Sequence, residues 1–169
     1  MINAILLEDF LTKQKLRRIS EEIGSIAASL QYKFISILIL SDGGDAISAV
    51  DFVETMAVVP IKFKIKIYRA GSAAAYIALA LSDKREMSRD ATLGLHRGEI
   101  RLSPTQISPD GKIDENLVKG FKKYDTALIE TMGKNGLNGL CASSYFYATD
   151  WLRISARECL KRGIVQKLF

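Results

Sequence analysis

The stretch that decides the fold is IKIYRAGSAAAYIALAL, residues 65–81. It continues the run IKFKIKI at residues 61–67, where apolar residues alternate strictly with lysines, and this period of two predicts a strand with the lysines facing outward. From residue 73, an unbroken run of small and apolar residues predicts a buried helix. The stretch therefore predicts a buried strand that passes directly into a buried helix, with a single hydroxyl, that of Ser72, at the junction.

Composition is typical of one globular domain, which we expect to span residues 1–169. The chain is 48% hydrophobic and 25% charged, and at this length a fold buries about two thirds of the surface of the unfolded chain. The formal net charge of +5 is a mild excess. Because there is no zinc-finger spacing, Gly-rich phosphate loop or aromatic RNA-binding motif, no nucleic-acid partner is expected.

Histidine and cysteine are scarce. There is one histidine, and Cys141 and Cys159 lie 18 residues apart without a Cys-x-x-Cys spacing. The sequence therefore predicts neither a metal site nor a disulfide framework. At the N-terminus, acidic residues follow a very short apolar run, which is typical of neither a signal peptide nor a membrane span. The expected location is the cytoplasm, without a membrane partner.

Strands and helices alternate along the rest of the chain. We expect strands at residues 4–7 and 34–40, helices at residues 12–30 and 46–57, and a loop SDGGD that ends the second strand. The run FISILIL at residues 34–40 is apolar throughout, which is typical of a parallel strand covered on both faces. Asp45 is the expected N-cap of the helix at 46–57. This order predicts an α/β fold with a mostly parallel sheet flanked by helices.

The C-terminal half continues the pattern. KREMS and TLGLH predict two short strands, and the polar stretch at residues 98–114 predicts a mobile loop or hairpin. A long helix is expected from Glu115 to Met132. A last helix at about 155–162 starts with a capping box formed by Ser155 and Glu158, and IVQKL predicts a closing strand.

Four features follow one another along the chain: the Gly43-Gly44 turn after a buried strand, Ser72, the unique His96 at a strand end, and Asp150. Each has an ordinary reading as a turn, an N-cap, a strand-end residue or a surface acid. Together they supply acyl-transfer chemistry. A serine needs an imidazole to take its proton, the imidazole needs an acid to orient it, and the oxyanion needs backbone N–H donors.

In this order the chain resembles the serine peptidases of the Clp protease proteolytic-subunit type. The matching stretches are LILSDGGDAISAVDFVETM, IKIYRAGSAAAYIALAL, DKREMSRDATLGLH and DWLRISARECLKRGIVQKL, and the resemblance covers roughly residues 38–168. The chain departs from the family where Asp42 replaces a proline before the two glycines, and where Arg97-Gly98 follows the histidine.

The resemblance implies the fold shared by Clp proteolytic subunits and the crotonase-like superfamily, with a protruding long helix. It implies a Ser72, His96 and Asp150 triad that cleaves peptides or unfolded proteins without a cofactor, and an oxyanion hole built from Gly43 or Gly44 together with Ala73. It further implies a ring of six or seven subunits, single or stacked. Because the chain begins almost at the first strand, no axial N-terminal loop and no ATPase partner are expected.

Alternatives remain at three points. The family's Gly-x-Ala-Ala-Ser motif can also be laid on residues 71–75, which would put Ala75 at the nucleophile position, although Ser72 matches the flanking strand and helix without gaps. Asp150 lies one residue further from SARE than the family's acid does, and Asp125 is a substitute. Finally, the chain could be an inactive scaffold or assembly subunit or, less favoured, an acyl-CoA hydratase or isomerase.

Overall fold

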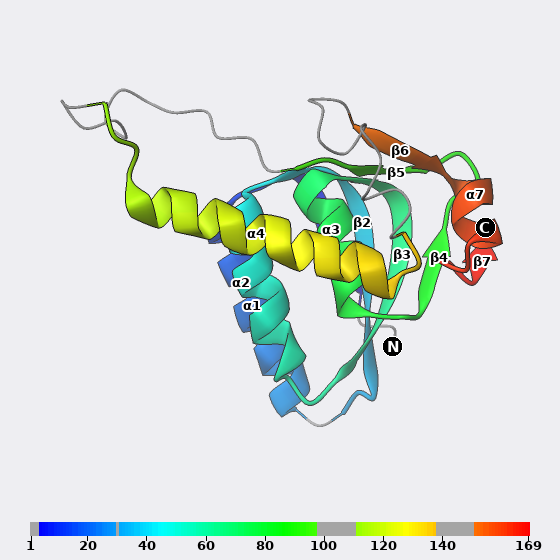
Figure 1. Cartoon of the computed structure of the whole chain (residues 1–169). Coiled ribbons are helices and arrows are strands. Elements are labelled where there is room, and N and C mark those ends of the chain that lie inside the picture. The colour runs from blue at the N-terminus through cyan, green and yellow to red at the C-terminus, as the bar shows by residue number, and fades with distance from the viewer. Residues whose placement is uncertain (1–3, 30, 98–110, 138–150) are drawn as a thin grey trace.

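The computed structural model describes residues 4–29, 31–97, 111–137 and 151–169. Its centre is a sheet in the order β1-β2-β3-β4-β7, with every neighbouring pair in this series parallel. A short strand, β5, extends the sheet beside the end of β3, and β6 pairs with β5 in antiparallel fashion. The α/β class predicted from the sequence is confirmed, with a mostly parallel sheet flanked by helices (Figure 1).

The elements lie close to their predicted positions. The strands are β1 (Ala4–Leu11), β2 (Phe34–Gly44), β3 (Lys62–Gly71), β4 (Arg85–Met87), β5 (Thr92–Leu95), β6 (Leu152–Ser155) and β7 (Lys167–Leu168). The helices are α1 (Lys13–Ala28), α2 (Ala46–Ala57), α3 (Ser72–Leu81), α4 (Glu115–Lys134) and α7 (Ala156–Lys161).

One expectation about β2 is wrong. The sequence predicts that SDGGD forms a loop that ends the strand at residue 40, but β2 continues to Gly44 because Phe10 and Leu11 of β1 pair with Gly43 and Gly44. The two glycines are therefore part of the sheet edge next to the end of β3. The closing strand is also shorter than predicted, and β6 was not predicted.

Local capping accounts for where the helices begin. The Asp45 carboxylate accepts a hydrogen bond from the Ser48 N–H at 2.9 Å and caps α2 as expected. Ser155 caps α7 by accepting from the Glu158 N–H at 3.3 Å. In contrast, α3 follows Gly71 without a side-chain cap. Ser72 is therefore not the N-cap that supplies a side-chain oxygen to the first turn.

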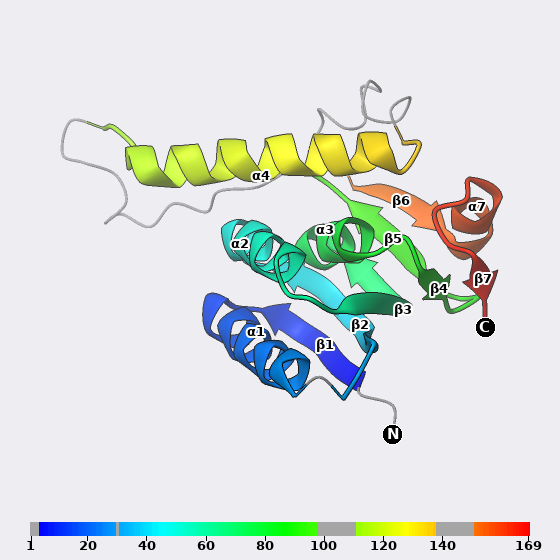
Figure 2. The ribbon, with the colours of Figure 1, turned by 90° about the horizontal axis from the view of Figure 1, so that it is seen from below.

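Helices α1, α2 and α3 lie along one face of the sheet, and α4 crosses over α2 and α3 (Figure 2). The side chains of β3 alternate as predicted, with Phe63, Ile65 and Ile67 buried under these helices. No described helix covers the opposite face. Part of that bare face is apolar, since Leu6, Phe10, Phe34, Leu40 and Tyr68 are each at least 40% exposed. A parallel sheet is normally covered on both faces, so this surface is unusual.

Buried Arg85 joins the C-terminal part of the chain to the core. Its guanidinium donates to the carbonyls of Leu79, Ser82 and Ile164 at 2.6–2.8 Å and to Asn135 Oδ1 at 2.5 Å. These bonds satisfy carbonyl groups at the end of α3 and in the loop before β7. Burial lowers the pKa of Arg85, and the four acceptors offset the cost of placing the charge there.

Candidate functional site

A cavity of about 700 Å³ opens at the carboxyl ends of β2, β3 and β5, where parallel strands of α/β sheets commonly bind ligands. Gly43, Gly44, Ser72 and His96 all line it. Ser72 directly follows β3 and His96 directly follows β5, and these strands are joined by the pairing of Gly71 with Gly94. The structure thus brings four of the predicted site residues to one cavity.

Ser72 has an uncommon backbone conformation. Its φ is +49°, in the left-handed region that non-glycine residues rarely adopt. The residue is the first of α3 and is partly buried, so the chain turns sharply from strand to helix at the hydroxyl. Strained backbone of this kind costs free energy and is concentrated at functional sites. A serine on a strained strand-to-helix turn is also how one large class of hydrolases exposes its nucleophile.

Gly43 lies against Ser72. A β-carbon on Gly43 would come within 2.6 Å of the Ser72 Cβ and 2.9 Å of the Gly71 carbonyl oxygen. Its φ of +117° also favours glycine. The close approach of β2 to the start of α3 therefore requires a residue without a side chain. The two glycines at the end of β2 therefore lie at the same cavity as Ser72.

The N–H groups around the cavity differ in their bonding. The Gly43 N–H donates to the Ser41 hydroxyl at 3.1 Å, and the Asp45 N–H donates to the Leu11 carbonyl at 2.8 Å. Ala73 is the second residue of α3, and the first N–H groups of a helix have no acceptor within the helix. A β-carbon on Gly43 would lie 3.2 Å from the Ala73 nitrogen, so the Ala73 N–H is next to Gly43.

His96 is half-buried, and its imidazole stacks on the indole of Trp151 with 4.4 Å between the ring centroids. The indole also packs over the backbone of β3 and β5, because β-carbons on Gly71 and Gly94 would each meet it at 2.8 Å. Within the described residues, no hydrogen bond joins His96 to Ser72. The sequence analysis did not identify Trp151, and only the pairing of β6 with β5 brings it to the cavity.

Of the two predicted acids, Asp150 lies outside the described residues. Asp125, the substitute, accepts hydrogen bonds from the Arg97 guanidinium at 2.6 and 3.0 Å. Arg97 directly follows the histidine, so Asp125 is held near this end of the site by an ion pair rather than by His96. Among the described residues, no group of three His, Cys, Asp or Glu side chains is arranged to hold a metal ion.

A buried tyrosine of α4 packs against α3, the helix that begins at Ser72. Tyr124 of α4 is 1% exposed, and its ring makes an edge-to-face contact with that of Tyr76 on α3, with 5.8 Å between centroids. Burial raises the pKa of Tyr124 well above its ordinary value, and the neighbouring Ser72 side chain lowers it in part. Tyr76 follows Ser72 by one helical turn on α3, so Tyr124 packs against the same end of this helix as the candidate nucleophile.

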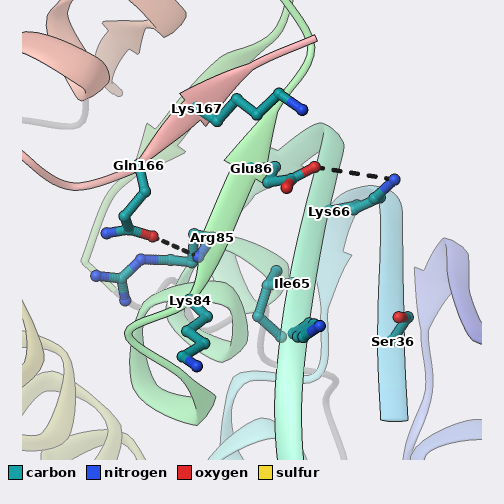
Figure 3. A pocket seen from close by; sticks show the side chains of 9 residues that line it. Ser36, Ile65, Lys66, Lys84, Arg85, Glu86, Gln166 and Lys167 are labelled. Atoms are coloured by element: carbon teal, nitrogen blue, oxygen red, sulfur yellow. Dashed lines mark hydrogen bonds and ion pairs between the residues drawn. The ribbon is translucent and has the colours of Figure 1, made fainter. Parts of the chain in front are cut away.

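A second groove, of about 350 Å³, lies between β3, β4 and β7 (Figure 3). It is basic, with Lys64, Lys66, Lys84 and Lys167 around it and Glu86 as the one acid, 3.8 Å from Lys66. Lys64 also lies over the Phe34 ring at 3.7 Å. Neither Ser72 nor His96 lines this groove, which is separate from the cavity at Ser72.

Comparison with known proteins adds no assignment. No model of a known protein family matches this chain, and no curated protein sequence matches it. In the part of the chain that the structure describes, no helix has the length and apolar character needed to cross a bilayer. The functional interpretation therefore rests on the geometry of the site.

Proposed function

We propose that the protein is a serine peptidase related to the Clp protease proteolytic subunits and their crotonase-like fold, with Ser72 as nucleophile. The observation that carries this proposal is the position of Ser72, which occupies a left-handed turn between β3 and α3, opens into a cavity that His96 also lines, and contacts Gly43. A packing serine or an ordinary N-cap has no need of this conformation.

In the proposed reaction, Ser72 Oγ attacks the carbonyl carbon of a peptide bond while His96 takes the hydroxyl proton. His96 then gives this proton to the leaving amine, which leaves an ester on Ser72. Water attacks the ester, His96 takes a proton from the water, and the proton returns to Ser72 as the acid product leaves. Asp150 is proposed to orient the imidazole. No cofactor takes part.

The N–H groups of Gly44 and Ala73 are the proposed oxyanion donors. The N–H groups of Gly43 and Asp45 are used by Ser41 and Leu11, on the β1 side of the strand. Gly44 also lines the cavity, so its N–H is the donor that we assign from the end of β2. Two donors next to the nucleophile would stabilise the charge that develops on the carbonyl oxygen.

Peptides or unfolded segments of proteins are the proposed substrates. The cavity is large enough for side chains, and Phe10, 68% exposed, offers an apolar wall. Its rim carries the ion pair of Arg69 with Asp42, 3.2 Å apart. An exposed pair of this kind adds little stability, so it can exchange partners with a substrate at low cost.

A homo-oligomer, in the form of a ring of six or seven subunits in the cytoplasm, is the proposed assembly. The bare face of the sheet supports it, because exposed Leu6 and Leu40 lie on neighbouring parallel strands there. Exposed apolar patches on this scale commonly mark interfaces.

Hydrolysis of a set of fluorogenic peptides tests the proposal. Replacement of Ser72 by alanine should lower turnover by about 10³-fold or more, with the fold intact by circular dichroism. A second candidate, an inactive scaffold of the same fold, is favoured by the stacking of His96 on Trp151 and the lack of a Ser72–His96 hydrogen bond. Turnover that is equal in the wild type and the Ser72→Ala variant would support the scaffold.

A further inference from the structure

The Tyr124 hydroxyl is the starting point, because it is buried and has no hydrogen-bond partner among the described residues. Nearly all buried polar groups in folded proteins are hydrogen-bonded, and one that is not deserves an explanation. Tyr124 is also among the largest fully buried side chains of the protein. The sequence assigns it only to the apolar face of α4, and phenylalanine would fill the same space without the polar atom.

Ser72 is the side chain that can satisfy this phenol. It lies one helical turn before Tyr76, the residue against which the Tyr124 ring packs, and it lowers the raised pKa of the phenol. The Tyr124 ring is fixed by its edge-to-face contact with Tyr76 and by the packing of α4 on α3. A serine, in contrast, moves its oxygen by rotation about a single bond. The partner that adjusts is therefore Ser72.

We propose that Tyr124 is a positioning residue that holds the Ser72 hydroxyl in a resting orientation, turned towards α4 and away from His96. This inference rests on the proposed function of Ser72. In the resting orientation Ser72 Oγ shares a hydrogen bond with the phenol, and in the reactive orientation it rotates into the cavity and donates to His96. Only the first orientation satisfies Tyr124, so the phenol biases the serine towards rest.

Both partners of the proposed hydrogen bond are neutral hydroxyls. Since burial keeps the pKa of the phenol well above 10, Tyr124 retains its proton at every pH at which the protein would work. A serine hydroxyl has one proton to donate and two lone pairs to accept with. Both hydroxyls can therefore donate or accept, and while Ser72 is held by Tyr124 it is not hydrogen-bonded to His96, in agreement with the described residues.

The rate of labelling by a fluorophosphonate probe tests the proposal, with Tyr124→Phe compared to the wild type by intact mass. Because the variant loses the partner that favours rest, we expect Ser72 to label about three- to tenfold faster. Tyr76→Phe is the matched control, since it removes a neighbouring buried phenol that has no hydrogen bond to Ser72 among the described residues, and it should label at the wild-type rate. A variant with a damaged site would be labelled more slowly, so structural damage cannot explain a faster rate of labelling.

A double-mutant cycle gives a readout that does not depend on activity. The free energies of unfolding of Ser72→Ala, Tyr124→Phe and the double variant are measured in urea, and the two single effects should not add, because both remove the same contact. Additive effects together with an unchanged labelling rate would overturn the proposal.

The two proposals can fail separately. If no variant is labelled, the proposed function fails, and the cycle alone then decides whether Tyr124 and Ser72 are coupled. If the wild type is labelled but Tyr124→Phe is labelled at the same rate or more slowly, the proposed function stands and the role of Tyr124 is overturned.

Discussion

Gly43 and Ser72 are in contact across the end of the sheet, so that a β-carbon on Gly43 would come within 2.6 Å of the Ser72 Cβ. Residues 29 positions apart are thus brought together by the parallel pairing of β2 and β3. The contact sets the distance between the end of β2 and the start of α3. A change at Gly43 therefore affects the nucleophile directly.

Replacement of Gly43 by alanine tests this contact. We expect a loss of stability of about 1–3 kcal/mol, because the φ of +117° is strained for alanine and the added methyl group meets backbone at 2.9 Å. Peptide hydrolysis should fall about 100-fold, because a shift of about 1 Å in the nucleophile is enough for such a loss. Urea unfolding and peptide turnover measure the two effects.

Gly24→Ala is the matched control. Gly24 lies inside α1 with no atom within 4 Å of an added β-carbon, so alanine there should stabilise the protein by about 0.5–1 kcal/mol and leave turnover unchanged. If Gly43→Ala kept the stability and turnover of the wild type, the contact between Gly43 and Ser72 would not require glycine.

Arg85→Lys tests the buried guanidinium. Lysine cannot reproduce the fork that reaches three carbonyls and Asn135, and it leaves several buried acceptors unsatisfied. We expect a loss of about 2–4 kcal/mol in the free energy of unfolding. Arg17→Lys, at an exposed pair with Glu21 on α1, is the control and should change stability by less than about 0.5 kcal/mol. Equal effects of the two substitutions would contradict the role given to Arg85.

Alkaline pH should destabilise the fold. Burial raises the pKa of Cys159 from 9.0 to about 11 and that of Tyr76 from 10.0 to about 12. The unfolded chain therefore loses these protons at lower pH than the folded chain, and the stability that they contribute, complete below about pH 9, is lost as the pH rises through 11 and 12. We expect a fall of about 2–4 kcal/mol between pH 8 and pH 11.

Urea unfolding at a series of pH values measures this fall. Burial raises the pKa of Tyr124 in the same way, so Tyr76→Phe removes one of three such groups, and its stability should depend less steeply on pH than that of the wild type. A free energy of unfolding that stays constant up to pH 11 would show that these side chains are not buried in the folded protein.

The bare face of the sheet makes a prediction about assembly. Leu6 and Leu40 are 44% and 40% exposed, so lysine at both positions should cost little stability in a single chain. If this face joins subunits, the double variant should elute as a smaller species in size-exclusion chromatography with light scattering. Val58→Lys is the control, because Val58 is 83% exposed at the end of α2, away from the sheet. An oligomer of unchanged mass in the double variant would exclude this face as the interface.

Local patterns in the sequence predict the elements around the site well. The bounds of α2 and its Asp45 cap follow from one capping residue and one helical period, and the alternation in β3 identifies its buried side chains. The order of Gly43, Ser72 and His96 is visible for the same reason, because each lies at the end of a strand that local periodicity reveals.

Tertiary pairing explains what the sequence does not predict. The extension of β2 to Gly44 depends on bridges to Phe10 and Leu11, and the position of Trp151 depends on the pairing of β6 with β5. Tyr124 looks like one more apolar contact of an amphipathic helix until the packing of α4 on α3 places its hydroxyl near Ser72. No local spacing carries that information.

Labelling of the intact protein with a fluorophosphonate probe, read by mass, tests the central claim most directly, because only an activated serine reacts. We expect one adduct on Ser72 in the wild type, no adduct in Ser72→Ala, and loss of most labelling in His96→Ala. A folded wild-type sample that takes up no probe, or that is labelled equally in Ser72→Ala, would contradict the claim that Ser72 is a catalytic nucleophile.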